Sequence, residues 1–137
     1  MDTVDKKTRS EMMSRIRSKD TKPERVVRSL LHRMGLRFRL HQRVEGCKPD
    51  IVLAKHKTAI FVHGCFWHRH KGCRFAYVPK SRTEFWMTKF KANTVRDEKN
   101  ERELNDAGWR VLIVWECEIR NLERLEAKLC QAFGTRR

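Results

Sequence analysis

No run of apolar residues in this chain approaches the roughly 20 that a membrane-spanning helix needs. The N-terminal segment MDTVDKKTRSEMM lacks the apolar core of a secretory signal peptide. A basic amphipathic stretch that could lie on a membrane is missing, and so is a lipidation motif. These absences exclude a membrane partner, and we expect the protein to be cytoplasmic.

Acidic residues are scarce relative to basic ones. The chain has 32 Lys and Arg against 17 Asp and Glu, a formal net charge of +15, and a sequence pI of about 10.2. The basic residues run along the whole length and form no separate tail. The folded surface itself is therefore expected to bind a polyanion such as a nucleic acid.

Repeats, low-complexity segments and linkers are also absent. Charged residues make up 36% of the chain and hydrophobic residues 39%, but the hydrophobic residues cluster in periodic segments, which indicates a folded protein. A length of 137 residues suits one domain with a modest core. We predict a single domain over residues 1–137, and we expect the five cysteines to be reduced thiols or metal ligands.

Hydrophobic periodicity, capping pairs and glycine stops predict the order helix, helix, three strands, helix, strand, helix. The WRVLIVW segment is too apolar for a sheet edge, so we expect a central strand there. The predicted elements are helices over residues 8–17, from Thr21 to Gly35 and from Ser81 to Gly108, an antiparallel meander of strands over 36–41, 50–53 and 58–63, the strand over 109–115, and a last helix carrying Leu122, Leu125, Leu129 and Phe133.

The remaining segment, residues 64–80, is a long loop that contains a zinc-like spacing. Cys65, His70 and Cys73 form a C-x4-H-x2-C set, and Zn²⁺ takes four nitrogen or sulfur ligands. Cys117 is the candidate fourth ligand, because a strand that ends just before it could lie under the loop. Buried thiols and a solvated histidine are the alternative. The loop has no obvious core of its own, which favours zinc, since ligation would supply folding energy.

An aspartate and two histidines are placed for phosphodiester chemistry. Asp50 precedes one predicted strand and His63 ends its partner, so both should meet at one end of the sheet. A carboxylate there suits Mg²⁺, and His63 and His68 can transfer a proton near neutral pH. Asp97, on the long helix, could orient one histidine. Taken singly, each residue has a commoner structural explanation as a turn or solvated side chain.

Large aromatic residues occur in segments that are otherwise basic. Phe66, Trp67 and Trp86 could wedge between DNA base steps, where unstacking costs a few kcal/mol. Core packing is the alternative for these three, and it is the preferred interpretation for Phe85, Phe90 and Trp109.

Together, these segments resemble the very-short-patch-repair (Vsr-type) mismatch endonucleases. The resemblance rests on KPDIVL, AIFVHGCFWHRHKGC, SRTEFWMTKFKANTVRDEKN and GWRVLIVWECEIR, with TRSEMMSRIRSKDTKPE near the N-terminus. It runs from about Thr8 to about Arg120, and HGCFWH, RTEFW and VLIVWEC are long, unusual strings. The resemblance implies an α/β fold similar to type II restriction endonucleases, with a mixed sheet flanked by helices and a zinc-stapled loop.

The resemblance also implies a function and its partners. Such an enzyme nicks one strand of double-stranded DNA 5′ of the thymine in a T·G mismatch, which arises when 5-methylcytosine deaminates. These bacterial enzymes usually accompany a cytosine-5 methyltransferase, and a mismatch-repair protein is the implied recruiting partner. Because a T·G mismatch is asymmetric, a monomer suffices.

Carried over residue by residue, the resemblance assigns site residues. The catalytic set is Asp50 as the Mg²⁺ ligand, the histidines His63 and His68, Asp97 as a histidine partner, and Glu24 near the site. The structural zinc ligands are Cys65, His70, Cys73 and Cys117. The wedging aromatics are Phe66, Trp67 and Trp86, and residues 1–20 form a basic, DNA-contacting helix segment.

Two positions depart from the family pattern. Val62 stands where the family often has threonine. The change is harmless if the family residue binds the metal through its backbone carbonyl, whereas one Mg²⁺ ligand is lost if it binds through its hydroxyl. Lys71 and Gly72 make the stretch between His70 and Cys73 one residue longer than in some relatives, so His68 could exchange roles with His70.

Two other functions would account for part of the pattern. A zinc-stabilised DNA-binding module without catalysis would share the charge, the aromatics and the zinc ligands, but it gives no reason for Asp50, His63, His68 and Asp97 to occur together. A restriction enzyme that cuts both strands of a matched site would normally need a symmetric dimer. The joint presence of the four residues favours the nicking enzyme.

Overall fold

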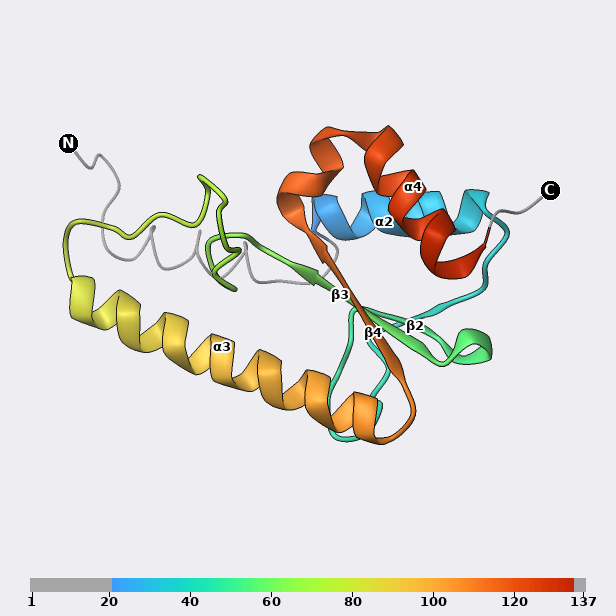
Figure 1. The fold of residues 1–137 in the computed structure, drawn as a ribbon, viewed down its shortest axis with the longest axis horizontal. Coiled ribbons are helices and arrows are strands. Elements are labelled where there is room, and N and C mark those ends of the chain that lie inside the picture. The colour runs from blue at the N-terminus through green and yellow to red at the C-terminus, as the bar shows by residue number, and fades with distance from the viewer. Residues whose placement is uncertain (1–20, 135–137) are drawn as a thin grey trace.

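The computed structural model describes residues 21–134, so the predicted helix over 8–17 and the basic segment 1–20 lie outside the described residues. Figure 1 shows the arrangement. The elements are α2 (Lys22–Arg33), β1 (Arg39–Leu40), β2 (Ile51–Leu53), the 3-10 helix η1 (Ala54–His56), β3 (Thr58–His63), α3 (Thr83–Asp106), β4 (Arg110–Trp115), the 3-10 helix η2 (Glu116–Arg120) and α4 (Leu122–Phe133).

The strands form one mixed sheet in the order β1-β2-β3-β4. β1 pairs with β2, and β2 with β3, in antiparallel fashion, which confirms the predicted meander. β4 then pairs with β3 in parallel. β1 has only two residues, fewer than the predicted strand over 36–41. Leu36 and Phe38 pack against the core from outside the sheet.

Helices cover both faces of this sheet, with α2 and α4 on one side and α3 on the other (Figure 1). The larger core joins the first face to α2 and α4, and the smaller core reaches α3 through Leu104. Because side chains alternate along a strand, Ile51 and Leu53 enter the larger core, whereas Val52 enters the smaller one. Residues at even positions of β2 and odd positions of β3 therefore face α3.

β4 lies at an edge of the described sheet, so the prediction of a central strand was wrong. Only Val114 of this strand is fully buried. The apolar side chains of β4 are covered by helices, and Lys128 of α4 donates a hydrogen bond to the Ile113 carbonyl oxygen at 2.7 Å. A lysine on an edge carbonyl blocks further strand pairing, and Lys128 lies outside the WRVLIVW motif, 15 residues after Ile113.

The helix termini agree with the sequence pattern in part. The Thr21 hydroxyl accepts a hydrogen bond from the Glu24 amide, which confirms the predicted cap of α2. The predicted Ser81 cap of α3 was wrong. α3 begins at Thr83 after Arg82, which has a positive φ of 55° and no capping side chain. Its end before Gly108 was predicted correctly, and that glycine has a φ of +87°.

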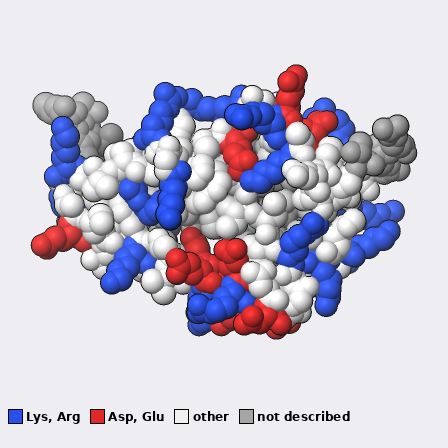
Figure 2. Space-filling model, in the orientation of Figure 1, with Lys and Arg blue, Asp and Glu red and all other residues white. Residues whose placement is uncertain are grey.

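The described surface is strongly charged. In the view of Figure 2, Lys and Arg side chains spread over most of the face, whereas acidic side chains gather over the second half of α3 and around η2 and α4. Among residues 21–134, no helix combines the length and the apolar character needed to cross a membrane.

Candidate active site and metal centre

Asp50 lies immediately before β2, at the end of the sheet where β3 finishes. Its Oδ2 atom accepts a hydrogen bond of 2.7 Å from the Val62 amide of β3, so the β2–β3 register sets the direction of the carboxylate. Burial raises the pKa of Asp50 from 3.8 to about 6, against the lowering effect of the Val62 hydrogen bond. A buried carboxylate of this kind is stabilised by a neighbouring positive charge.

His63, His68 and Asp97 meet at the end of β3, although they come from a strand, a loop and a helix. His68 Nδ1 lies 2.6 Å from Asp97 Oδ2, so Asp97 accepts a hydrogen bond from Nδ1–H and Nε2 is left as the proton acceptor. The His63 ring stacks on the His68 ring with centroids 3.8 Å apart. Burial, followed by the charge of His68, lowers the pKa of His63 to about 4, so His63 is neutral at pH 7.

Glu24 lies in the first turn of α2 and is 2% exposed. Its Oε2 atom is 3.3 Å from His41 Nε2. One ligand atom each from Glu24, His41 and Asp50 lies within 4.8 Å of the others. Sequence analysis missed His41, because it follows Arg37 and Arg39 on the polar side of an alternating segment and carries no motif of its own.

Residues of both groups line one open cleft. Glu24, Asp50, His63, His68 and Asp97 all contribute to its lining. Basic side chains of Arg43, Lys48, Arg96 and Lys99 line it as well. The arrangement can hold a divalent cation at carboxylates, accept a proton at an imidazole and bind an anion with lysine and arginine.

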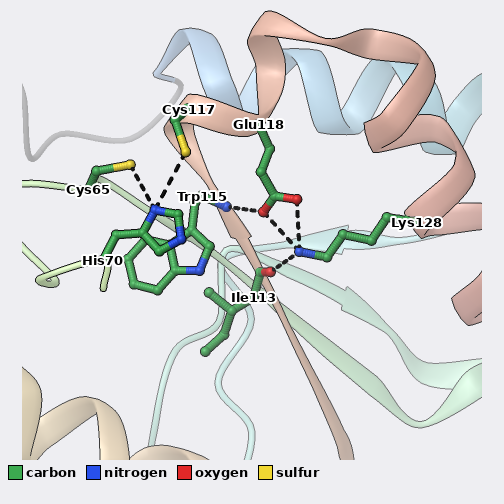
Figure 3. Close-up of polar contacts among 7 residues, drawn as sticks. All are labelled: Cys65, His70, Ile113, Trp115, Cys117, Glu118 and Lys128. Carbon is green, nitrogen blue, oxygen red and sulfur yellow. Dashed lines mark hydrogen bonds and ion pairs between the residues drawn. The ribbon is translucent and has the colours of Figure 1, made fainter. Parts of the chain in front are cut away.

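Cys65, His70, Cys73 and Cys117 form a separate cluster in which one ligand atom from each lies within 4.8 Å of the others. His70 Nδ1 is 3.5 Å from both Cys65 Sγ and Cys117 Sγ (Figure 3). This cluster can hold a metal ion, and its sulfur and nitrogen donors suit zinc. The structure places His70 in this cluster and His68 beside Asp97, and so separates the two histidines that the sequence left exchangeable.

The parallel pairing of β3 and β4 explains how Cys117 reaches the loop. His63 and Trp115 are the last partners of that pair, so the residues that follow each strand leave the sheet side by side. The Cys65 amide then donates a hydrogen bond to Glu116 Oε1 at 2.9 Å. Trp115 stacks on the His70 ring with centroids 4.1 Å apart (Figure 3). Burial raises the pKa of the Cys65 thiol and so disfavours its thiolate form. A bound cation would stabilise that thiolate.

Glu118 and Lys128 brace the segment that carries Cys117. Glu118 Oε1 accepts a hydrogen bond from the Trp115 amide at 2.8 Å, and Lys128 Nζ lies 2.8 Å from the same oxygen (Figure 3). No sequence motif marks this pair, which joins η2 to α4.

Arg69 binds the backbone of its own loop and packs against α3. Its guanidinium donates hydrogen bonds to the carbonyl oxygens of Phe66, Ala76 and Tyr77 at 2.8 to 3.2 Å. It also lies 3.9 Å from the centre of the Phe90 ring of α3. Arg69 therefore joins both ends of the loop to the long helix. The sequence shows only one more arginine among many, so this residue was missed.

The three proposed wedge residues lie together at one end of α3. Ring centroids are 5.2 Å apart for Phe66 and Trp67, 5.4 Å for Phe66 and Trp86, and 5.7 Å for Trp67 and Trp86. Trp67 is only 9% exposed. Phe90 is in the core as predicted, but Phe85 is 41% exposed, so its predicted burial was wrong. Trp109 packs partly buried against the smaller core.

Comparisons with known proteins give a consistent result. The family model described as DNA mismatch endonuclease Vsr matches residues 1–74. The chain is 48% identical over 128 residues to the type II nicking enzyme V.XorIIP of Xanthomonas oryzae, covering 93% of each chain. It is 45% identical over 124 residues to the DNA mismatch endonuclease Vsr of Escherichia coli, covering 90% of this chain and 79% of that one.

A solved structure shares the fold. The catalytic domain of the homing endonuclease I-Bth0305I matches with a TM-score of 0.60 and 24% identity, covering 83% of this chain and 95% of that one. This match confirms the α/β endonuclease core, a mixed sheet flanked by helices, that the sequence predicted.

Proposed function

Because this chain belongs to the Vsr family of DNA mismatch endonucleases, it is a DNA repair endonuclease, and we propose that it nicks one strand 5′ of the thymine in a T·G mismatch. The observation that carries the proposal is the meeting of Asp50, His63, His68, Asp97 and Glu24 in one cleft. A binding module without catalysis would need none of these contacts.

Asp50 fits a Mg²⁺ ligand. It is a partly buried carboxylate whose Oδ2 is aligned by the Val62 amide, and desolvation raises its pKa to about 6, so a cation beside it would be stabilising. The valine side chain has no ligand atom, so any contact from Val62 to the cation would have to come from its backbone carbonyl oxygen. Bound there, the cation would neutralise charge on the phosphate and on the leaving 3′ oxygen.

His68 is the proposed proton acceptor for the attacking water. Asp97 accepts a hydrogen bond from its Nδ1–H group, which leaves Nε2 available, and the carboxylate stabilises the ring once it becomes positively charged. His63 stacks on this ring and stays neutral because of burial. A neutral neighbour holds the His68 plane without the repulsion that a second imidazolium would add.

The three aromatic residues and the zinc cluster support a T·G mismatch as the substrate. Phe66, Trp67 and Trp86 lie beside the cleft on the loop and α3, where insertion between base steps would favour a wobble pair that unstacks at lower cost than a matched pair. Zinc at Cys65, His70, Cys73 and Cys117 would hold the base of this loop. Six of these seven residues lie within residues 65–86, and Cys117 comes from η2.

The proposal also covers the whole protein and its partners. Residues 1–137 act as one endonuclease domain, and as a monomer, because the mismatch lacks two-fold symmetry. Residues 1–20 contact the DNA backbone. A cytosine-5 methyltransferase creates the sites that later deaminate, and a mismatch-repair protein recruits the enzyme.

The test uses end-labelled duplexes that differ only by T·G against C·G at one pair, in several flanking contexts, with and without Mg²⁺. The expected result is a Mg²⁺-dependent nick in the thymine strand only. Asp50→Asn should abolish the nick while keeping an acceptor for the Val62 amide. Asp106→Asn, an exposed aspartate at the end of α3, is the matched control. Equal cutting of C·G, cutting of both strands, or binding without cutting would each overturn the proposal.

A further inference from the structure

A second group of ligand atoms shares Asp50 with the proposed Mg²⁺ site, and the mechanism above gives His41 no role and Glu24 no ligand role. It consists of Glu24 from α2, His41 from the turn after β1, and Asp50 itself. We propose that these three side chains hold a second divalent cation, and that the imidazole of His41 makes this position favour a transition metal such as Mn²⁺ over Mg²⁺. Binding of this cation is independent of the proposed function, and only a role of the cation in cleavage rests on that function.

The distances suit ligands of one ion. Ligand atoms about 2.2 Å from a metal and at right angles to each other are about 3.1 Å apart, and opposite ligands are about 4.4 Å apart. Glu24 Oε2 and His41 Nε2 are 3.3 Å apart, and all three ligand atoms lie within 4.8 Å of one another. The spacing therefore leaves room for an ion between neighbouring ligands.

The burial of Glu24 and the missing hydrogen-bond partners at this position also support a cation site. Glu24 is 2% exposed. Within residues 21–134, the buried atoms Glu24 Oε2 and His41 Nε2 have no hydrogen-bond partner, although they face each other. A buried carboxylate oxygen normally accepts hydrogen bonds. Here the nearest fixed positive charge is that of Arg28, whose Nη1 is 3.8 Å from Glu24 Oε2, and the His41 ring adds charge only when it is protonated.

The donor set determines which cation is favoured. Mg²⁺ takes oxygen ligands and keeps much of its water, whereas transition metals accept imidazole nitrogen readily. Two carboxylates and one imidazole therefore suit Mn²⁺ or a later transition metal. Among the metal-ligand groups of residues 21–134, only the cluster around Cys65 contains thiols, and Mn²⁺ has little tendency to occupy such a cluster. Mn²⁺ therefore distinguishes the cleft from the thiol cluster.

The test measures binding to the full-length, zinc-loaded protein without DNA. Mn²⁺ is titrated by electron paramagnetic resonance, and pulsed measurements detect nitrogen bound directly to the metal. We expect nitrogen coupling in the wild type. His41→Gln keeps a polar side chain of similar reach, so it should abolish this coupling and weaken Mn²⁺ binding by about tenfold or more, but weaken Mg²⁺ competition by less than about threefold.

Two further variants complete the test. His32→Gln, at an exposed histidine of α2, is the matched control and should behave as wild type. Glu24→Gln should weaken Mn²⁺ and Mg²⁺ alike. If it does so while circular dichroism shows a folded protein, the site stands even if His41→Gln fails to fold.

Three results would overturn the inference. They are absence of bound Mn²⁺, Mn²⁺ bound without nitrogen in the wild type, and nitrogen coupling that persists in His41→Gln, which would place the ligand at His63 or His68. The T·G nicking assay is independent of these readouts. Failure to nick with intact nitrogen coupling would overturn only the proposed function, and normal nicking without the coupling would overturn only the second cation.

Discussion

Burial of the Asp50 carboxylate lowers the free energy of unfolding of the metal-free protein at neutral pH. Its pKa is raised from 3.8 to about 6, so the folded state takes up a proton in a pH range where the unfolded state stays ionised. Above pH 6 the carboxylate is ionised in both states and destabilises the fold. As the pH falls from about 6 towards 3.8, this cost disappears.

Asp50→Asn should therefore stabilise the protein at pH 7 when no divalent cation is added. The gain is at most about 3 kcal/mol, at about 1.4 kcal/mol for each pKa unit, and it should vanish near pH 4. Urea unfolding at both pH values measures the difference. Added Mg²⁺ should narrow the gap, because it binds the aspartate form. A variant that is less stable at pH 7 would contradict this account of the burial.

Asp97 acts through the imidazole of His68. Asp97→Asn would hold the wrong tautomer of that ring and remove the charge that stabilises its protonated form. We expect single-turnover nicking of T·G duplexes to slow by about 10²- to 10⁴-fold, with duplex affinity nearly unchanged. Asp106→Asn is the control on the same helix. If the rate stayed at the wild-type level, His68 could not be the proton acceptor.

At the scale of elements, the loop between β3 and α3 is held by contacts with its own backbone. Arg69 donates to three loop carbonyl oxygens. Arg69→Gln should lower the free energy of unfolding by about 2 kcal/mol and speed hydrogen exchange within residues 64–80. Lys71→Gln, at an exposed neighbour, should change neither. Equal exchange rates in wild type and variant would show that zinc ligands alone order the loop.

The cluster that joins this loop to η2 gives a second prediction for the same elements. Cys117→Ala should release the bound metal and lower the thermal midpoint, because metal binding adds directly to folding free energy. Metal content and thermal unfolding are measured together, with Cys130→Ala as control. A folded, metal-free and fully active Cys117→Ala protein would rule out the structural-zinc proposal.

For the whole molecule, the net charge of +15 predicts how DNA affinity depends on salt. If six to ten phosphates are contacted, affinity falls by about 10³- to 10⁵-fold between 50 and 200 mM salt. The slope should be the same for T·G and C·G duplexes, because phosphate contacts do not depend on the mismatch. Fluorescence anisotropy over a salt series measures both slopes. A steeper slope for T·G would mean that the mismatch recruits additional phosphate contacts.

Several elements could be predicted from local pattern alone. α2 was predicted with its cap because Thr21 and the apolar spacing lie within one short segment, and such signals act over a few residues. The antiparallel meander followed from alternation and short connections. Asp50 and His63 were placed at one end of the sheet because antiparallel neighbours bring the start of one strand beside the end of the next.

The remaining features depended on contacts between distant segments. His41 lies beside Glu24, and Glu116 beside Cys65, only because the packing of α2 on the sheet and the parallel β3–β4 pairing bring them together. β4 lies at an edge of the described sheet although its composition is typical of a central strand. Its apolar residues are tolerated there because helices and Lys128 cover the strand. Local sequence thus determined the elements and most chemical groups, whereas tertiary packing decided which groups share a cleft, since those contacts join residues far apart in the chain.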